Sequence, residues 1–256
     1  MKRFFYLLRF EFKNLLISPS TYVSAFLFLS LMTLIYLVIL SGFSQLPHNT
    51  PPSTQFFQTF WLPVLFMVPL LTMKSVADEA RRGTLQTTLA TSLSSLAFIL
   101  AKFFSAYLLY LLLWSITLCF PFIIQQFFLP HSSLHTSLLF NAPSIFGSYL
   151  FIALSGLLFI AIGIFTSSLT RSQLIAGILS FSLLFTLIIC TRFIFELPFF
   201  SYSYPHSFTP SITYLHIFDH LNDFSNGIFD TRALIFYISS STLLLGTSSL
   251  FIRSKV

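Results

Sequence analysis

The sequence predicts an all-α, polytopic membrane protein with six transmembrane helices, an N-terminal amphipathic interfacial helix and a short charged helix on the cytoplasmic side. Hydrophobic residues make up 55% of the 256 residues and charged residues 8%, whereas a soluble domain carries about 25% charged residues. Six apolar stretches approach the roughly 20 residues that cross a bilayer as a helix. The chain is therefore solvated by lipid, and we expect one transmembrane domain over residues 1–256.

The first predicted element is a helix over Lys2–Ile17, which carries too many charges to span a bilayer. At 100° per residue its apolar and basic side chains form adjoining stripes, which are Phe5, Leu8, Phe12 and Leu15 beside Lys2, Arg9 and Lys13. We expect residues 1–20 to lie in the membrane interface, with the rings at the acyl boundary and the cations near lipid phosphates. The periodicity fits a plain anchor and also a helix that touches a cytoplasmic partner.

The six predicted spans are the apolar runs between charged or Pro-rich segments. They are Tyr22–Leu40, Phe56–Met73, Phe98–Phe120, Ile145–Ser168, Leu174–Phe195 and Ala233–Ile252. Pro63 and Pro69 predict kinks in the second span. Gly156 and Gly163 in the fourth span permit close helix contact, either inside one chain or at a dimer seam.

The distribution of Lys and Arg predicts the orientation of these spans. Of the 13 basic residues, eleven lie on the side that holds both termini, and only Arg192 and Arg232 lie on the other side. The positive-inside rule makes the first side cytoplasmic. The net charge of +6 is then a topology signal, and we expect no nucleic-acid partner.

The outer connections hold all six histidines. In the longest connection, 198–231, helix-like spacing predicts a short helix within Leu215–Phe229 that enters the membrane from outside. Two pairs of histidines four residues apart, with Asp219 and Asp223 near the second, could hold a divalent ion; they are His131 with His135 and His216 with His220. Because no third well-spaced ligand joins them, we expect no metal site.

Residues 74–95 form a charged cytoplasmic connection between the second and third spans. Asp78 and Arg82 are an i,i+4 pair in the order that stabilises a helix. Gly83 can end this helix, and Thr84 can cap a second, short one. Such a helix suits docking to a partner, although the composition also fits an ordinary charged loop.

Two segments carry a more specific pattern. Residues 71–86 read LTMKSVADEARRGTLQ and are followed by LAKF at 100–103, and residues 220–232 read HLNDFSNGIFDTR just before the last span. Their order and spacing resemble those of membrane subunits of type-2 ATP-binding-cassette (ABC) exporters, in the gliding-motility-type branch. Gln86, Ser92 and Asn226 depart from the family's usual Glu, Pro and Arg.

The resemblance implies a permease of the bacterial cytoplasmic (inner) membrane that works with a second permease subunit, identical or not, and with two copies of a cytoplasmic ABC ATPase. It implies a coupling helix that contacts the ATPase through Asp78, Glu79, Arg81, Arg82, Gly83, Thr84 and Gln86, together with Arg9 and Lys13 of the first helix. It also assigns an outer segment to His220, Asp223, Phe224 and Gly227. The chain has no G-x-x-x-x-G-K-[ST] loop, so ATP and Mg²⁺ would bind the partner and this chain would be no enzyme.

One charged pair and three alternative classes of membrane protein are also to be considered from the residues. Arg192 and Glu196, at the outer end of the fifth span, either neutralise each other four residues apart or line a substrate path. A permease for haem or cofactor maturation would also have six spans. A membrane-embedded enzyme needs convergent polar groups at one depth, and a secondary carrier needs ionisable groups within the spans; both patterns are weak here.

Overall fold

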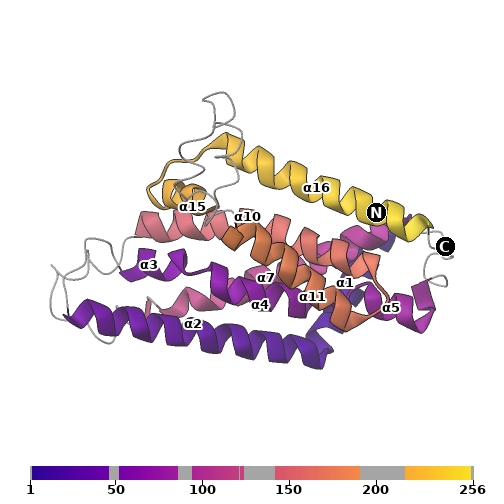
Figure 1. The fold of residues 1–256 in the computed structure, drawn as a ribbon, viewed down its shortest axis with the longest axis horizontal. Helices are drawn as coiled ribbons and strands as arrows, with labels where there is room; N and C mark the ends of the chain where they lie inside the picture. Colours follow the sequence, from indigo (N-terminus) through magenta and orange to yellow (C-terminus); the bar gives the residue numbers. More distant parts are fainter. Residues whose placement is uncertain are drawn as a thin grey trace.

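The computed structural model describes residues 2–45, 52–85, 94–120, 122–123, 142–190 and 217–254. Every regular element in these ranges is a helix (Figure 1). Five helices of the described part are long and apolar enough to cross a membrane, and they are Pro19–Gly42, Trp61–Arg82, Ser95–Thr117, Pro143–Leu169 and Thr231–Ser254. The chain is thus built as a multi-pass membrane protein. The sixth predicted span, Leu174–Phe195, is described as a shorter apolar helix, Gln173–Ile189, and its end lies outside the described residues.

The helices follow one another along the chain with short connections in the described part. Their bounds are α1 Lys2–Ile17, α2 Pro19–Gln45, α3 Pro52–Gln58, α4 Trp61–Thr72, α5 Ala77–Arg82, α7 Ser95–Thr117, α10 Ala142–Leu169, α11 Gln173–Phe185, the π-helical turn η1 Thr186–Cys190, α15 Ile217–Ser225 and α16 Thr231–Ser254. The short helix predicted within Leu215–Phe229 corresponds to α15.

The helix α1 has the predicted bounds, and Pro19 at the start of α2 explains its end. The chain turns at Ser18, and the Thr21 hydroxyl donates to the Leu15 carbonyl at 2.6 Å. The predicted orientation of its apolar stripe is partly wrong. Phe12 and Leu15 pack on the core, because the side of α1 that carries them lies against α7. Phe5, from the same predicted stripe, is exposed.

The second span is broken one turn before the first predicted kink. α3 ends at Gln58 and α4 begins at Trp61. Proline removes the N–H that would bond the carbonyl four residues earlier and crowds that carbonyl, which for Pro63 belongs to Thr59. The interruption therefore falls at Thr59–Phe60, while Pro69 is accommodated inside α4.

The helix α10 lies at the centre of the bundle, and its three glycines are in close contact with other helices of the same chain. A methyl group at Gly147 would overlap the Phe224 carbonyl of α15, at Gly156 the Tyr110 ring of α7, and at Gly163 the Thr72 side chain of α4. The Tyr110 hydroxyl also donates to the Ile152 carbonyl at 3.2 Å. Gly156 and Gly163 therefore form packing seams within one chain, not the dimer seam that the sequence left open.

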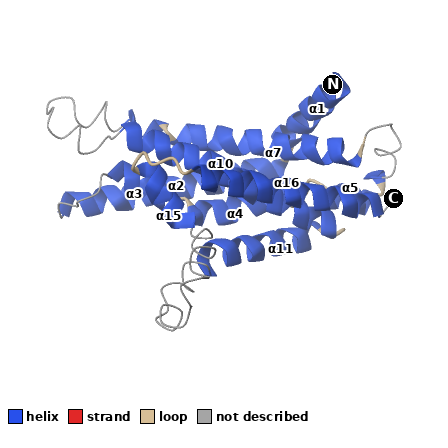
Figure 2. Cartoon of the chain, turned by 90° about the horizontal axis from the view of Figure 1, so that it is seen from above, coloured by secondary structure: helices blue, strands red, loops and turns tan. Residues whose placement is uncertain are grey.

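The two ends of the bundle are built differently (Figures 1 and 2). The start of α1, the end of α16 and the helix α5 lie at one end, and α3 and α15 lie at the other. In Figure 2, α1 projects from the bundle at an angle to the long helices. This grouping agrees with the predicted placement of both termini on the side of residues 74–95.

The glycine seams can be tested by adding one methyl group. Gly156→Ala should destabilise the protein by about 1–3 kcal/mol, because the Tyr110 ring must move. Gly246→Ala is the matched control, since a Cβ there meets nothing within 4 Å; it should be neutral or slightly stabilising. Equilibrium unfolding in detergent micelles measures both, and equal effects would contradict the packing described.

Candidate functional site

The short helix α5 carries most of the residues that the sequence singled out. Its acidic residues Asp78 and Glu79 lie in the first turn and its basic residues Arg81 and Arg82 in the last, an order that complements the helix dipole. It ends at Gly83, whose φ of 73° places it in the left-handed region, where glycine is favoured. The prediction that Gly83 ends this helix is confirmed.

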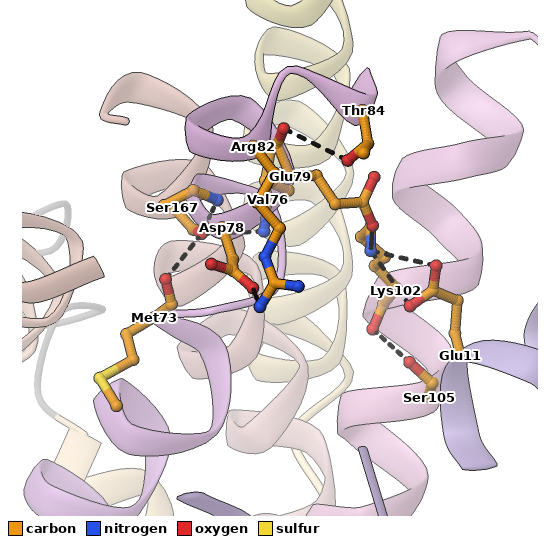
Figure 3. A network of polar contacts seen from close by, with 11 residues as sticks. Glu11, Met73, Val76, Asp78, Glu79, Arg82, Thr84, Lys102, Ser105 and Ser167 are labelled. Atoms are coloured by element: carbon orange, nitrogen blue, oxygen red, sulfur yellow. Dashed lines mark hydrogen bonds and ion pairs between the residues drawn. The ribbon is translucent and has the colours of Figure 1, made fainter. Parts of the chain in front are cut away.

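The beginning of α5 is capped from another helix. The backbone N–H groups of Val76 and Ala77 both donate to the Ser167 hydroxyl of α10, each at 3.1 Å. The same hydroxyl donates to the Met73 carbonyl at 3.3 Å. Ser167 is fully buried. This one side chain of α10 therefore provides hydrogen-bond partners for the buried backbone groups of the turn between α4 and α5 (Figure 3).

A buried ionic cluster ties α5 to two further helices (Figure 3). The Lys102 ammonium of α7 lies 2.5 Å from Glu79 of α5 and 3.1 Å from Glu11 of α1. The Lys102 side chain is only 4% exposed and that of Glu11 only 11%. The Phe98 ring lies 4.8 Å from the same ammonium and adds a cation–π contact. Charges buried to this degree are stable only when paired.

Asp78 connects α5 to a fourth helix. Its carboxylate accepts from Arg82 at 2.8 Å and from Arg81 at 3.2 Å, which confirms the predicted i,i+4 pair. It also accepts from the Gln173 side chain at the start of α11, at 2.5 Å. The acidic residues of α5 thus point into the protein, whereas Arg81 and Arg82 are 61% and 65% exposed.

The remaining residues predicted for the cytoplasmic contact are placed as follows. The Thr84 hydroxyl donates to the Glu79 carbonyl at 3.4 Å and so helps to end α5; Thr84 and Leu85 are helical. Arg9 and Lys13 are exposed on α1. Gln86 and Ser92 lie outside the described residues, as do Arg192 and Glu196 near the end of the fifth span.

The predicted outer segment lies at the opposite end of the bundle, and its last residues form the C-terminal cap of α15. His220 of α15 is within 3.2 Å of the Tyr237 hydroxyl of α16, and Phe224 is buried. Ile228 N–H donates to the Asp223 carbonyl at 2.8 Å and Gly227 N–H to the Phe224 carbonyl at 3.0 Å. With Gly227 at φ 81°, this is a Schellman motif, so these residues have a structural role in ending α15.

Metal binding gains no support in the described ranges, where no three His, Cys, Asp or Glu side chains gather. Of the six histidines, His220 is described, and the others lie outside. The absence of a metal site stays a prediction.

Sequence reasoning missed four residues of this site, which are Glu11, Lys102, Ser167 and Gln173. A signal was present for the first two, because Glu11 is the only acidic residue before Asp78 and Lys102 is the only charge in its span. A charge within a span requires a partner, so the two could have been paired. Ser167 and Gln173 carry no such signal, since hydroxyl and amide side chains are common at helix ends.

Comparison of the sequence with protein-family models gives no match, and comparison with curated proteins gives none either.

The ionic cluster makes a sharp prediction about stability. Lys102→Met should destabilise the protein by about 3–5 kcal/mol, because it leaves Glu11 and Glu79 buried without a cation. Adding Glu11→Gln and Glu79→Gln to Lys102→Met should recover most of this loss, since no buried charge then remains. Equilibrium unfolding in detergent micelles compares the variants. A triple variant as unstable as the single one would contradict the assigned role.

Proposed function

We propose that this chain is the membrane-spanning permease subunit of an ATP-driven export complex of the type-2 ABC class. The observation that supports this most is the construction of α5. It exposes Arg81 and Arg82. Its two carboxylates bind side chains of α7 and α11, and its first backbone N–H binds the Ser167 hydroxyl of α10. Lys102 of α7 links it further to Glu11 of α1. An ordinary charged loop has no need of three direct anchors.

The anchors suggest how the helix would work. A cytoplasmic ATPase that presses on Arg81 and Arg82 would displace α5. Through Ser167 and Gln173 the displacement would reach α10 and α11, and through Lys102 it would reach α7 and α1. Because the cluster is buried and close-packed, it would transmit force without yielding. ATP and Mg²⁺ would bind the partner ATPase, present in two copies beside a second permease subunit in the bacterial inner membrane.

The positions of the described charges also argue against a secondary carrier. The buried ion pair of Glu11 and Lys102 also includes Glu79 of α5, so it joins α1, α5 and α7. A secondary carrier would instead need coupled ionisable groups near the membrane centre. No observation favours haem or cofactor maturation over another cargo, and the apolar spans suit a lipid, an amphiphile or a hydrophobic peptide.

The proposed contact can be tested by capture from native membranes. Arg81→Glu with Arg82→Glu should reduce recovery of an ABC ATPase with the tagged chain at least about tenfold, because charge reversal at an interface costs more than 1.4 kcal/mol. Arg171→Glu with Arg253→Glu is the matched control, since both residues are exposed and lie outside α5. Mass spectrometry quantifies the recovered protein. If the wild-type chain recovers no ATPase, the proposal is wrong.

The orientation is tested by labelling. In a chain with Cys119→Ser and Cys190→Ser, a cysteine at Arg82 should react with a membrane-impermeant maleimide only after the cells are opened. A cysteine at Phe229, on the side of α15, should react in intact cells. The reverse pattern would place α5 outside and exclude contact with a cytoplasmic ATPase.

A further inference from the structure

The helix α1 has an outer face that the described part of its own chain does not cover. Four large apolar side chains on it, Phe5, Tyr6, Phe10 and Ile17, are each at least 60% exposed. The side turned toward α7 packs through residues such as Leu15, and Phe12 packs on the core at the border between the two sides. Large apolar side chains exposed together on one helix face mark a contact with a membrane or a partner.

Two cations lie within this apolar surface. At 100° per residue, Arg9 and Lys13 fall between Phe5 on one side and Tyr6 and Phe10 on the other. Both cations are exposed, and residues four apart on a helix lie side by side. They can therefore approach a single anion together while the flanking rings remain at the same level of the bilayer.

The only acidic residue of α1 does not offset these charges. Glu11 lies on the inner face, held by Lys102 at 3.1 Å. Among the other described acids, Asp78 and Glu79 are paired at α5, and the remainder belong to α15 and the turn before α16. The described side chains of the outer face thus carry positive charge only.

We propose that the outer face of α1 binds the headgroups of anionic phospholipids, with Arg9 and Lys13 on the lipid phosphate and the flanking rings at the acyl boundary. Charge complementarity selects an anionic lipid, since each Lys or Arg near an anionic bilayer strengthens binding about fivefold. The exposed rings select a bilayer over a water-soluble protein, because they interleave with the cations and need an apolar medium at the same depth. This inference does not depend on the proposed transport role.

Trp fluorescence quenching measures the lipid at this face directly. The full chain carrying Phe10→Trp is reconstituted in vesicles of equal parts phosphatidylcholine and phosphatidylglycerol, with brominated acyl chains on one lipid or the other. The quenching of the chain that lacks Phe10→Trp is subtracted from that of the Phe10→Trp chain. The difference shows which lipid contacts position 10. We expect phosphatidylglycerol to be enriched on the order of five- to thirtyfold, with less enrichment at high salt.

The variants separate a specific site from general attraction of a basic protein. Arg9→Gln with Lys13→Gln should reduce the enrichment to about onefold, whereas Arg9→Lys with Lys13→Arg should keep it. Arg171→Gln with Arg253→Gln removes two exposed charges elsewhere and should also keep it. Because Arg9 and Lys13 are exposed, these variants should fold, and their unfolding midpoints in detergent verify this.

Two results would overturn the proposal. One is equal quenching by the two lipids in the parent chain, and the other is enrichment that persists in the Arg9→Gln, Lys13→Gln variant. If these cations instead hold a cytoplasmic protein, the lipids would quench equally, and the double variant would lose a protein that co-purifies with the chain from native membranes.

Discussion

A buried lysine that must be neutralised determines how the α5 end of this molecule is assembled. Lys102 is 4% exposed, and an ammonium group cannot be withdrawn from water at that level without a carboxylate partner. It has two, Glu11 and Glu79, which belong to helices on either side of it. The pairing therefore fixes the positions of α1, α5 and α7 relative to one another. If one of these helices moved away, a buried charge would be left without its partner.

The helix α10 provides the second constraint. Its glycines let α7 and α4 approach closely, and Ser167 near its end holds the start of α5. A helix of six residues has little stability of its own, so the caps from Ser167 and Gly83 and the ion pairs of Asp78 and Glu79 are what keep α5 helical. Its conformation is thus a property of the whole bundle end, and this is the physical reason to regard it as a rigid contact element.

The sequence predicts the local features well, and the tertiary ones only in part. The bounds of α1 follow from Pro19, and the end of α5 from Gly83, because proline and glycine act on their immediate neighbours. The predicted apolar stripe of α1 was correct in period but only partly correct in partner, because Phe12 and Leu15 pack on the protein core while Phe5 is exposed, and periodicity cannot tell a lipid from a helix such as α7. The break before Pro63 was displaced by four residues, because proline disrupts the carbonyl one turn earlier. The cluster of Glu11 and Lys102 joins residues 91 positions apart, and no local pattern specifies such a distance.

The two faces of α1 are connected by this same cluster. At 100° per residue Glu11 falls on the opposite side of α1 from Arg9 and Lys13. The ion pair with Lys102 turns Glu11 toward α7, so the same contact that fastens α1 to the bundle also turns Arg9 and Lys13 outward. The ion pair, together with the packing of Phe12 and Leu15 on the core, therefore couples the anchoring of α1 to the direction in which its basic side chains point.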